Sequence, residues 1–210
     1  MAGFDRSRIH RRQADANHEH GRIRSLHGSR EQVNSRRRTC GADLPWVSTL
    51  GGPLIVVPES ACRHWNGGWL MKHHDDEGDY RRACDVDGYI GLVDVGPAKA
   101  LVLGDQPAIT TFLPASDLFV RWIAASSEAE VLDVATEAVG SARWDEELTW
   151  DIDGPVILFD SVVGHDDLAT EEHLRIDIPP GCYTVRAAYI QTETVMTVVV
   201  RLTNGGRRAG

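Results

Sequence analysis

The hydrophobic residues of this chain gather in short runs that are separated by glycine- and proline-containing turns. Residues 53–58 form one such run, bounded by Gly51-Gly52 and by Pro58, which predicts a buried strand. Residues 89–95, the turn Gly96-Pro97 and residues 100–103 together predict a hairpin. The same pattern of hydrophobic runs and turns predicts further strands near 109–113, 118–124, 144–152, 156–159, 174–178, 183–189 and 195–202. Strand should therefore exceed helix.

Helical periodicity is clear in one segment. Ser127 and Glu130 form a capping-box pattern, and Gly140 stands where a helix would end. Between them hydrophobic residues recur at helical spacing, at Val131, Leu132, Ala135, Ala138 and Val139. We therefore expect a helix over 127–139, a shorter one within 59–69, and a polar, acidic loop over 73–80.

The predicted fold is α+β and β-rich, with two similar antiparallel β halves packed together, one or two short helices, and a disordered N-terminal tail. The Gly-Pro strand at 52–60 is echoed by the one at 154–161, and 93–98 is echoed by 176–181. These echoes suggest an internal duplication of 45–125 and 144–204 within one domain, 45–204. Chance similarity between common hairpin patterns is the alternative.

Charge divides the chain at about residue 44. Of its 22 basic and 31 acidic residues, positions 1–43 hold ten and five, which leaves 12 and 26 for the rest. The basic tail, 1–44, lacks any sustained hydrophobic period and is predicted to be disordered. A binding arm or an upstream misassigned start are alternatives. The acidic remainder should not bind nucleic acid, but it would attract a basic partner or simply favour solubility.

Membrane and secretion signals are missing from the pattern. No window approaches 18 consecutive hydrophobic residues, and no hydrophobic segment follows the basic N-terminal residues. We therefore expect a cytoplasmic protein with no membrane partner.

Signatures of catalysis and metal binding are weak throughout. The string at 73–77, His-His-Asp-Asp-Glu, has metal-binding residue types, but neighbours in an extended loop point in opposite directions. The four cysteines form no CxxC pair, and Cys84 and Cys182 are interpreted as buried strand residues. No P-loop, GxSxG or HExxH motif occurs. The pattern predicts no enzyme, no metal and no cofactor.

Two tryptophans stand next to the acidic segment. Trp65 and Trp69 flank Gly67-Gly68, immediately before the acids of 75–79. Aromatic anchors beside a charged rim are typical of protein-binding patches. Tryptophan is equally common in cores, which is where we place Trp122 and Trp150. Both interpretations stay open for Trp65 and Trp69.

Seven segments, taken in order, resemble the immunity protein 21 family of bacterial polymorphic toxin systems. They begin with GGPLIVVPES at 51–60 and end with LRIDIPPG at 174–181, and those between are 79–84, 89–91, 100–105, 110–114 and 154–161. The resemblance covers about 45–203, and the tail has no counterpart in it. It rests on the order and density of strands and turns, since no segment carries diagnostic chemistry.

The resemblance implies a cytosolic antidote that binds and neutralises a cognate toxin, with neither catalysis nor a cofactor. A toxin that acts on nucleic acid would present a basic surface, which an acidic inhibitor could cover. The candidate toxin-binding residues are Trp65, Trp69, Asp75, Asp76, Glu77, Asp79, Asp145, Glu146 and Glu147. A ligand-binding β-sandwich and a metal-dependent hydrolase are the alternative functions.

Overall fold

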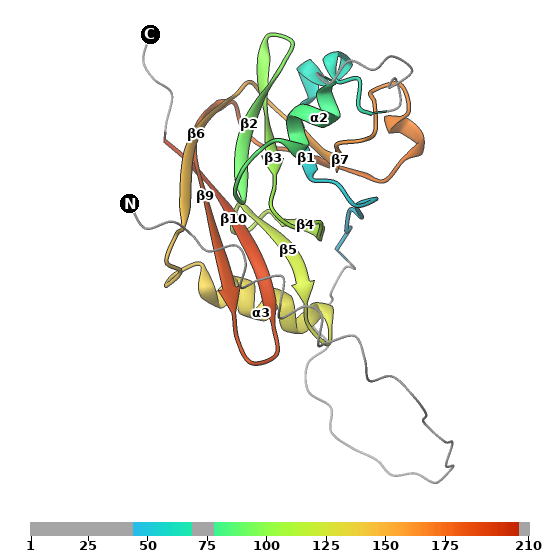
Figure 1. Cartoon of the computed structure of the whole chain (residues 1–210). Coiled ribbons are helices and arrows are strands. Elements are labelled where there is room, and N and C mark those ends of the chain that lie inside the picture. The colour runs from blue at the N-terminus through green and yellow to red at the C-terminus, as the bar shows by residue number, and fades with distance from the viewer. Residues whose placement is uncertain (1–43, 69–77, 206–210) are drawn as a thin grey trace, which may run out of the picture. The chain divides into compact units, whose positions relative to one another are not determined.

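Two antiparallel sheets of five strands each dominate the structure, a computed structural model that describes residues 44–68 and 78–205 (Figure 1). Few helices accompany them. The β-rich α+β class expected from the sequence is confirmed. All of the described residues belong to the unit that spans Ala42–Gly210.

The first sheet has the strand order β2-β3-β1-β7-β8. Its central strand, β1, pairs with β3 on one side and with β7 on the other. The register places Val56 opposite both Leu101 and Leu158. The strands are β1 (Leu54–Pro58), β2 (Ile90–Val95), β3 (Ala98–Leu103), β7 (Val156–Asp160) and β8 (His173–Ile176).

The second sheet has the order β4-β5-β10-β9-β6. The hairpins β4–β5 and β9–β10 are joined side by side by the pairing of β5 with β10. Strand β6 is added at one edge, where it pairs with β9. The strands are β4 (Ile109–Leu113), β5 (Leu118–Ala124), β6 (Glu146–Ile152), β9 (Gly181–Gln191) and β10 (Met196–Asn204).

Both faces of β1 are buried, which explains its unbroken hydrophobic run. Leu54 and Val56 point into the core between the two sheets. Ile55 and Val57 point to the outside of the first sheet, where a second cluster covers them. That covering layer comes from the 3-10 helix η1 (Glu59–His64), helix α2 (Asp79–Cys84) and the loop 161–172, which contains the 3-10 helix η2 (Leu168–Thr170).

Helix α3 (Glu128–Ala138) lies across the outer face of the second sheet (Figure 1). The Ser127 Oγ accepts a hydrogen bond from the Glu130 backbone N–H, as the capping pattern predicts. The Glu130 carboxylate instead accepts from the N–H of Ser126, one residue earlier than in a capping box. Val131 and Ala135 are buried against the sheet.

Two local expectations need correction around α2. Asp79 and Tyr80, placed in a loop by the sequence, form the first turn of this helix. Cys84, interpreted as a buried strand residue, ends the helix and is exposed. Local pattern failed here because only Ala83 of the six helical residues is buried, too few to show a helical period. The rest of the predicted loop, 69–77, lies outside the described residues.

The strand order bears on the predicted duplication. The two Gly-Pro strands are β1 and β7, and they pair with each other at the centre of the first sheet. The hairpins β4–β5 and β9–β10 hold corresponding places in the second sheet. The second echo is less regular, because 93–95 belongs to β2 while, of the corresponding residues 176–178, only Ile176 belongs to β8. The duplication stays a prediction.

Candidate functional site

The two sheets meet along one side, where edge strand β2 contacts edge strand β6. The Glu146 carboxylate of β6 joins them. It accepts hydrogen bonds from the backbone N–H of Tyr89, at 2.9 and 3.0 Å to its two oxygens, and from that of Ile90 at 3.0 Å. A side chain of one sheet therefore satisfies backbone donors at the start of the other sheet's edge strand.

Gly88 makes room for this contact. A Cβ at Gly88 would lie 2.5 Å from the Glu146 Oε1 atom, and the residue has a φ of +96°. Both the close approach and the left-handed backbone favour glycine. The turn before β2 is thus shaped around the carboxylate.

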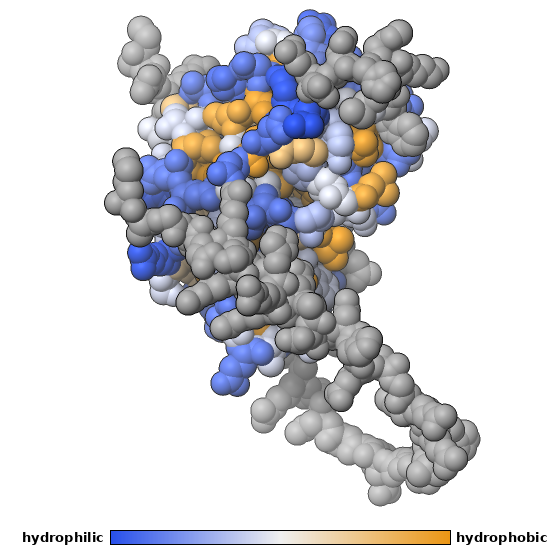
Figure 2. All heavy atoms as spheres, in the orientation of Figure 1, coloured by the Kyte–Doolittle hydropathy of each residue, from blue (hydrophilic) through white to orange (hydrophobic). Residues whose placement is uncertain are grey.

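Hydrophobic and aromatic side chains are partly exposed along the same side. They are Tyr89, Leu92, Leu148 and Tyr189, and each packs on the edge of the inter-sheet core. We call these four residues and the carboxylates Asp105, Asp145 and Glu146 the β2–β6 seam. In Figure 2, orange hydrophobic residues are exposed at the surface between the positions of β2 and β6, with blue hydrophilic residues around them. The seam is a hydrophobic strip with an acidic rim.

The rings of Tyr89 and Tyr189 are stacked, with centroids 6.4 Å apart and planes inclined by 7°. Tyr189 is held in place through Asp145, whose Oδ2 accepts its backbone N–H at 3.0 Å. Asp145 also donates its own N–H to the carbonyl of Ala187 at 2.9 Å. One exposed carboxylate therefore lies directly beside the aromatic pair.

The negative charge of the seam affects the pKa of its tyrosine hydroxyls. Burial, followed by the negative charges of Asp105 and Asp145, raises the pKa of Tyr89 to about 12, with smaller effects from Tyr189 and Glu146. Burial also raises the pKa of Tyr189. Both hydroxyls are protonated at neutral pH, and the carboxylates around Tyr89 create a negative potential that would favour a cation.

A buried arginine supports the loop that carries Asp105. Arg121 of β5 donates to the carbonyls of Gly104, at 2.6 Å, and Gln106. Its Nε has no hydrogen-bond partner among the described residues. Burial lowers the pKa of Arg121 to about 10, while Asp105 and Tyr89 oppose that change. The loop between β3 and β4 is thus tied to the sheet interior.

The opposite edges of the sheets, β4 and β8, are connected differently. The segment 45–50, which we call the N-terminal strap, forms a two-way backbone bridge between Val47 and Thr110 of β4. Its Ser48 N–H donates to Glu172, next to β8, at 3.0 Å, and its Leu50 N–H donates to the buried Asp160 at 2.5 Å. Backbone from the chain itself covers this side.

Trp65, one of the two predicted aromatic anchors, is only 1% exposed. It packs in the layer that covers the first sheet, and its indole N–H donates to the Ser161 carbonyl at 3.1 Å. The structure thus favours the core interpretation that the sequence left open. Contact between Trp65 and a partner would require this layer to open. Trp150 is likewise buried, as expected, while Trp122 is partly buried beneath α3.

Asp79 has structural contacts of its own at the start of α2. Its carboxylate accepts the backbone N–H of Asn66 at 2.7 Å and forms an ion pair with Arg82. It thereby holds the segment that follows Trp65 against the helix. The neighbouring candidates Trp69, Asp75, Asp76 and Glu77 lie outside the described residues.

The three acids of 145–147 have separate roles despite their adjacency. Asp145 and Glu146 belong to the β2–β6 seam, where Glu146 is partly buried. Glu147 points to the other face of β6 and pairs with Arg186 at 2.6 Å. The predicted residues that the structure describes therefore do not lie at one place: Trp65 and Asp79 lie outside the first sheet, and 145–147 lie at the edge of the second.

Sequence reasoning missed the two tyrosines. They are separated by a hundred positions, and the sequence pattern predicts an ordinary strand residue at each. The available signal was limited to Tyr89, which begins a predicted strand shortly after Asp85 and Asp87. Their proximity comes from the β2–β6 contact, which no local pattern encodes.

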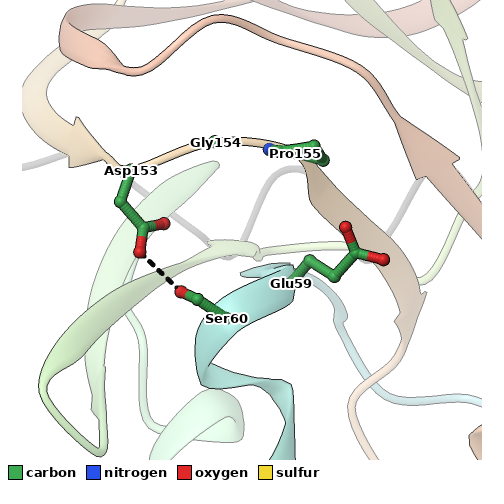
Figure 3. A pocket seen from close by; sticks show the side chains of 5 residues that line it. All are labelled: Glu59, Ser60, Asp153, Gly154 and Pro155. Atoms are coloured by element: carbon green, nitrogen blue, oxygen red, sulfur yellow. Dashed lines mark hydrogen bonds between the residues drawn. The ribbon is translucent and has the colours of Figure 1, made fainter.

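A second feature is an open depression of about 300 Å³ lined by Glu59, Ser60, Asp153, Gly154 and Pro155 (Figure 3). The Ser60 hydroxyl donates to Asp153 at 2.6 Å. Glu59 is paired with Arg175, so its charge is already balanced. Among the residues that the structure describes, no histidine lines the depression to activate the serine, and we find no catalytic arrangement there.

Within residues 44–68 and 78–205, no group of three or more His, Cys, Asp and Glu side chains could hold a metal ion. The predicted metal-like string at 73–77 falls in the gap between these ranges. In the same ranges, no helix is long and hydrophobic enough to cross a membrane.

The described part of the chain is a two-sheet β fold with an acidic, aromatic seam along one side. In comparison with known families, the sequence pattern of immunity protein 21 matches residues 45–196. The chain belongs to the immunity protein 21 family, which confirms the resemblance drawn from its strands and turns. No match was found among curated proteins or among solved structures.

Proposed function

We propose that this immunity protein is a cytoplasmic antidote that binds a cognate toxin and covers its active site or substrate surface. The family supports this role. The observation that carries it is the β2–β6 seam, where partly exposed hydrophobic and aromatic residues are bordered by carboxylates. Such a centre and rim resemble the anatomy of protein interfaces.

The proposed partner has a basic surface. Residues 44–210 carry 26 acidic and 12 basic side chains, so the field around the domain is negative. A field of one sign speeds the association of an oppositely charged partner. The antidote itself would work by binding alone, as part of a polymorphic toxin system, and would need neither catalysis nor a cofactor.

The candidate residues divide under this proposal. Asp145 contributes to the contact together with the seam, and Glu147 adds to the long-range field from the other face of β6. Trp69, Asp75, Asp76 and Glu77 are proposed as a second part of the contact. A structural role is proposed for the other three candidates, because their side chains form hydrogen bonds to the backbone of neighbouring segments: Glu146, Asp79 and Trp65.

Co-expression tests the proposal directly. The full chain would be produced together with the protein encoded next to it, and growth and complex formation would be measured by plating and size-exclusion chromatography. We expect growth to be rescued and a stoichiometric complex to elute. Toxicity that persists with no complex, although the chain is folded and soluble, would overturn the proposal.

Variants would locate the contact in the same assay. Asp145→Arg reverses a charge at the seam, and Asp151→Arg makes the same change at an exposed position farther along β6. We expect Asp145→Arg to weaken rescue and complex formation while Asp151→Arg leaves both near the wild-type level. Thermal unfolding of both proteins would separate lost binding from lost stability.

A further inference from the structure

We propose that the stacked Tyr89–Tyr189 pair, together with Asp105 and Asp145, binds an arginine or lysine side chain of the toxin. This inference rests on the proposed function and deepens it by assigning the chemistry that the partner must present. The partner chemistry follows from three features of the site: ring faces, fixed carboxylates and incomplete burial.

The ring faces are available in part. Carbon atoms in contact are about 3.5–4.0 Å apart, so parallel rings with centroids 6.4 Å apart cannot cover one another completely. Both tyrosines are also only partly buried. The face of an aromatic ring carries negative electrostatic potential and attracts guanidinium and ammonium groups. The pair therefore offers a platform for a cation.

The carboxylates beside the rings strengthen this preference. Asp145 is exposed, and its side chain is oriented by the hydrogen bond from the Tyr189 backbone. Asp105 is exposed on the loop that Arg121 ties to the sheet. Neither carboxylate forms an ion pair among the described residues. A cation on the rings would thus meet two unpaired negative charges on a fixed frame.

Hydrogen bonds hold the backbone of both tyrosines. Glu146 anchors the backbone of Tyr89, and Asp145 anchors the backbone of Tyr189. Two backbones from different sheets are thus held in position by Glu146, the first residue of β6, and by Asp145 immediately before it. Preorganised side chains lose little freedom on binding, which favours a tyrosine pair as an interface hot spot.

The test compares ring and charge variants of the full chain, with the neighbouring gene's toxin as the probe and the dissociation constant as the readout. Tyr189→Leu removes the aromatic face, and we expect binding about three- to thirtyfold weaker. Tyr189→Phe keeps the face and should bind within about twofold of the wild type. Thermal unfolding would show whether each variant is folded at the assay temperature.

A second comparison uses charge and does not depend on the ring variants folding. Asp145→Asn keeps an acceptor for the Tyr189 N–H but loses the charge, while Glu147→Gln makes the same change on the other face of β6. We expect Asp145→Asn to weaken binding and to reduce its dependence on salt concentration more than Glu147→Gln does.

Scanning the arginines and lysines of the toxin to glutamine completes the test. One of them should weaken binding to the wild-type antidote and have little effect on binding to Tyr189→Leu, as expected for a directly coupled pair. If the wild type binds but Tyr189→Leu and Asp145→Asn bind equally well, the inference is wrong while the proposed function stands. Absence of binding by the folded wild type would overturn both.

Discussion

The two sides of the β-sandwich are closed by different means. On the β4–β8 side, backbone of the N-terminal strap reaches a sheet edge and a buried carboxylate. On the β2–β6 side, the Glu146 side chain holds the edges together, and hydrophobic residues stay partly exposed beside it. A strap covers the edge groups that could attract another chain. Within residues 44–68 and 78–205 no such strap covers the β2–β6 side, which is the side that we propose for the partner.

This comparison predicts its largest effect at Glu146. Glu146→Ala would leave the partly buried N–H groups of Tyr89 and Ile90 without an acceptor, and we expect the free energy of unfolding to fall by about 2–4 kcal/mol. Chemical denaturation would measure it. The matched control is Glu147→Ala, which removes an exposed ion pair and should cost less than about 1 kcal/mol. Equal costs would show that Glu146 does not join the sheets.

Asp160 tests the opposite side. It is 4% exposed and accepts the N–H groups of Leu50 and Val162. Asp160→Asn retains one acceptor oxygen, so we expect a loss of about 1–2 kcal/mol in the free energy of unfolding. Amide hydrogen exchange should quicken at Leu50, because the strap loses its anchor. Unchanged exchange there would mean that the strap is held by its other contacts.

Alkaline titration sharpens the description of the seam. With a pKa of about 12, Tyr89 should ionise well above the ordinary value near 10, which ultraviolet absorbance would detect. The unfolded chain loses this proton at lower pH than the folded chain does, so stability should decline as the pH rises from about 10 to 12. Asp145→Asn should lower the pKa of Tyr89. If the midpoint of the Tyr89 titration is unchanged in that variant, the Asp145 charge does not raise the pKa of Tyr89.

The smallest effect is expected at Glu172, which accepts the Ser48 N–H of the strap. This hydrogen bond lowers the pKa of the Glu172 carboxyl, so its contribution is present at neutral pH and is lost as the pH falls through that lowered pKa. Protection of the Ser48 amide, corrected for intrinsic exchange, should decrease in acid. Glu172→Gln should show weaker protection at neutral pH and little further change in acid.

Much of the fold could be predicted from local pattern. The predicted strands at 109–113 and 118–124 coincide with β4 and β5, and the capped helix is α3 within a residue at each end. The helix is visible because burial of one face imposes a period on its residues. β5 is visible because both of its faces are buried over residues 118–120, which gives a short hydrophobic run. α2 was missed since only one of its residues is buried.

Of the candidate site, only acidic residues could be predicted from the sequence. The cluster at 145–147 stands out in the sequence, but period-two alternation along β6 sends Glu146 and Glu147 to opposite faces. Which of them meets the other sheet depends on strand order. Trp65 shows the same limit, because an aromatic residue beside an acidic segment looks alike whether a covering layer buries it or not.

The sequence by itself determined the strand-and-turn order, the acidic character of residues 44–210 and the membership in the immunity protein 21 family. These are properties of neighbouring residues, of composition or of order along the chain. Only the tertiary structure decided that Tyr89 and Tyr189 stack, that Glu146 joins two sheets, and that the strap at 45–50 lies along the β4–β8 side. Each of these depends on contacts between distant segments, which the pairing of sheet edges creates and local periodicity does not specify.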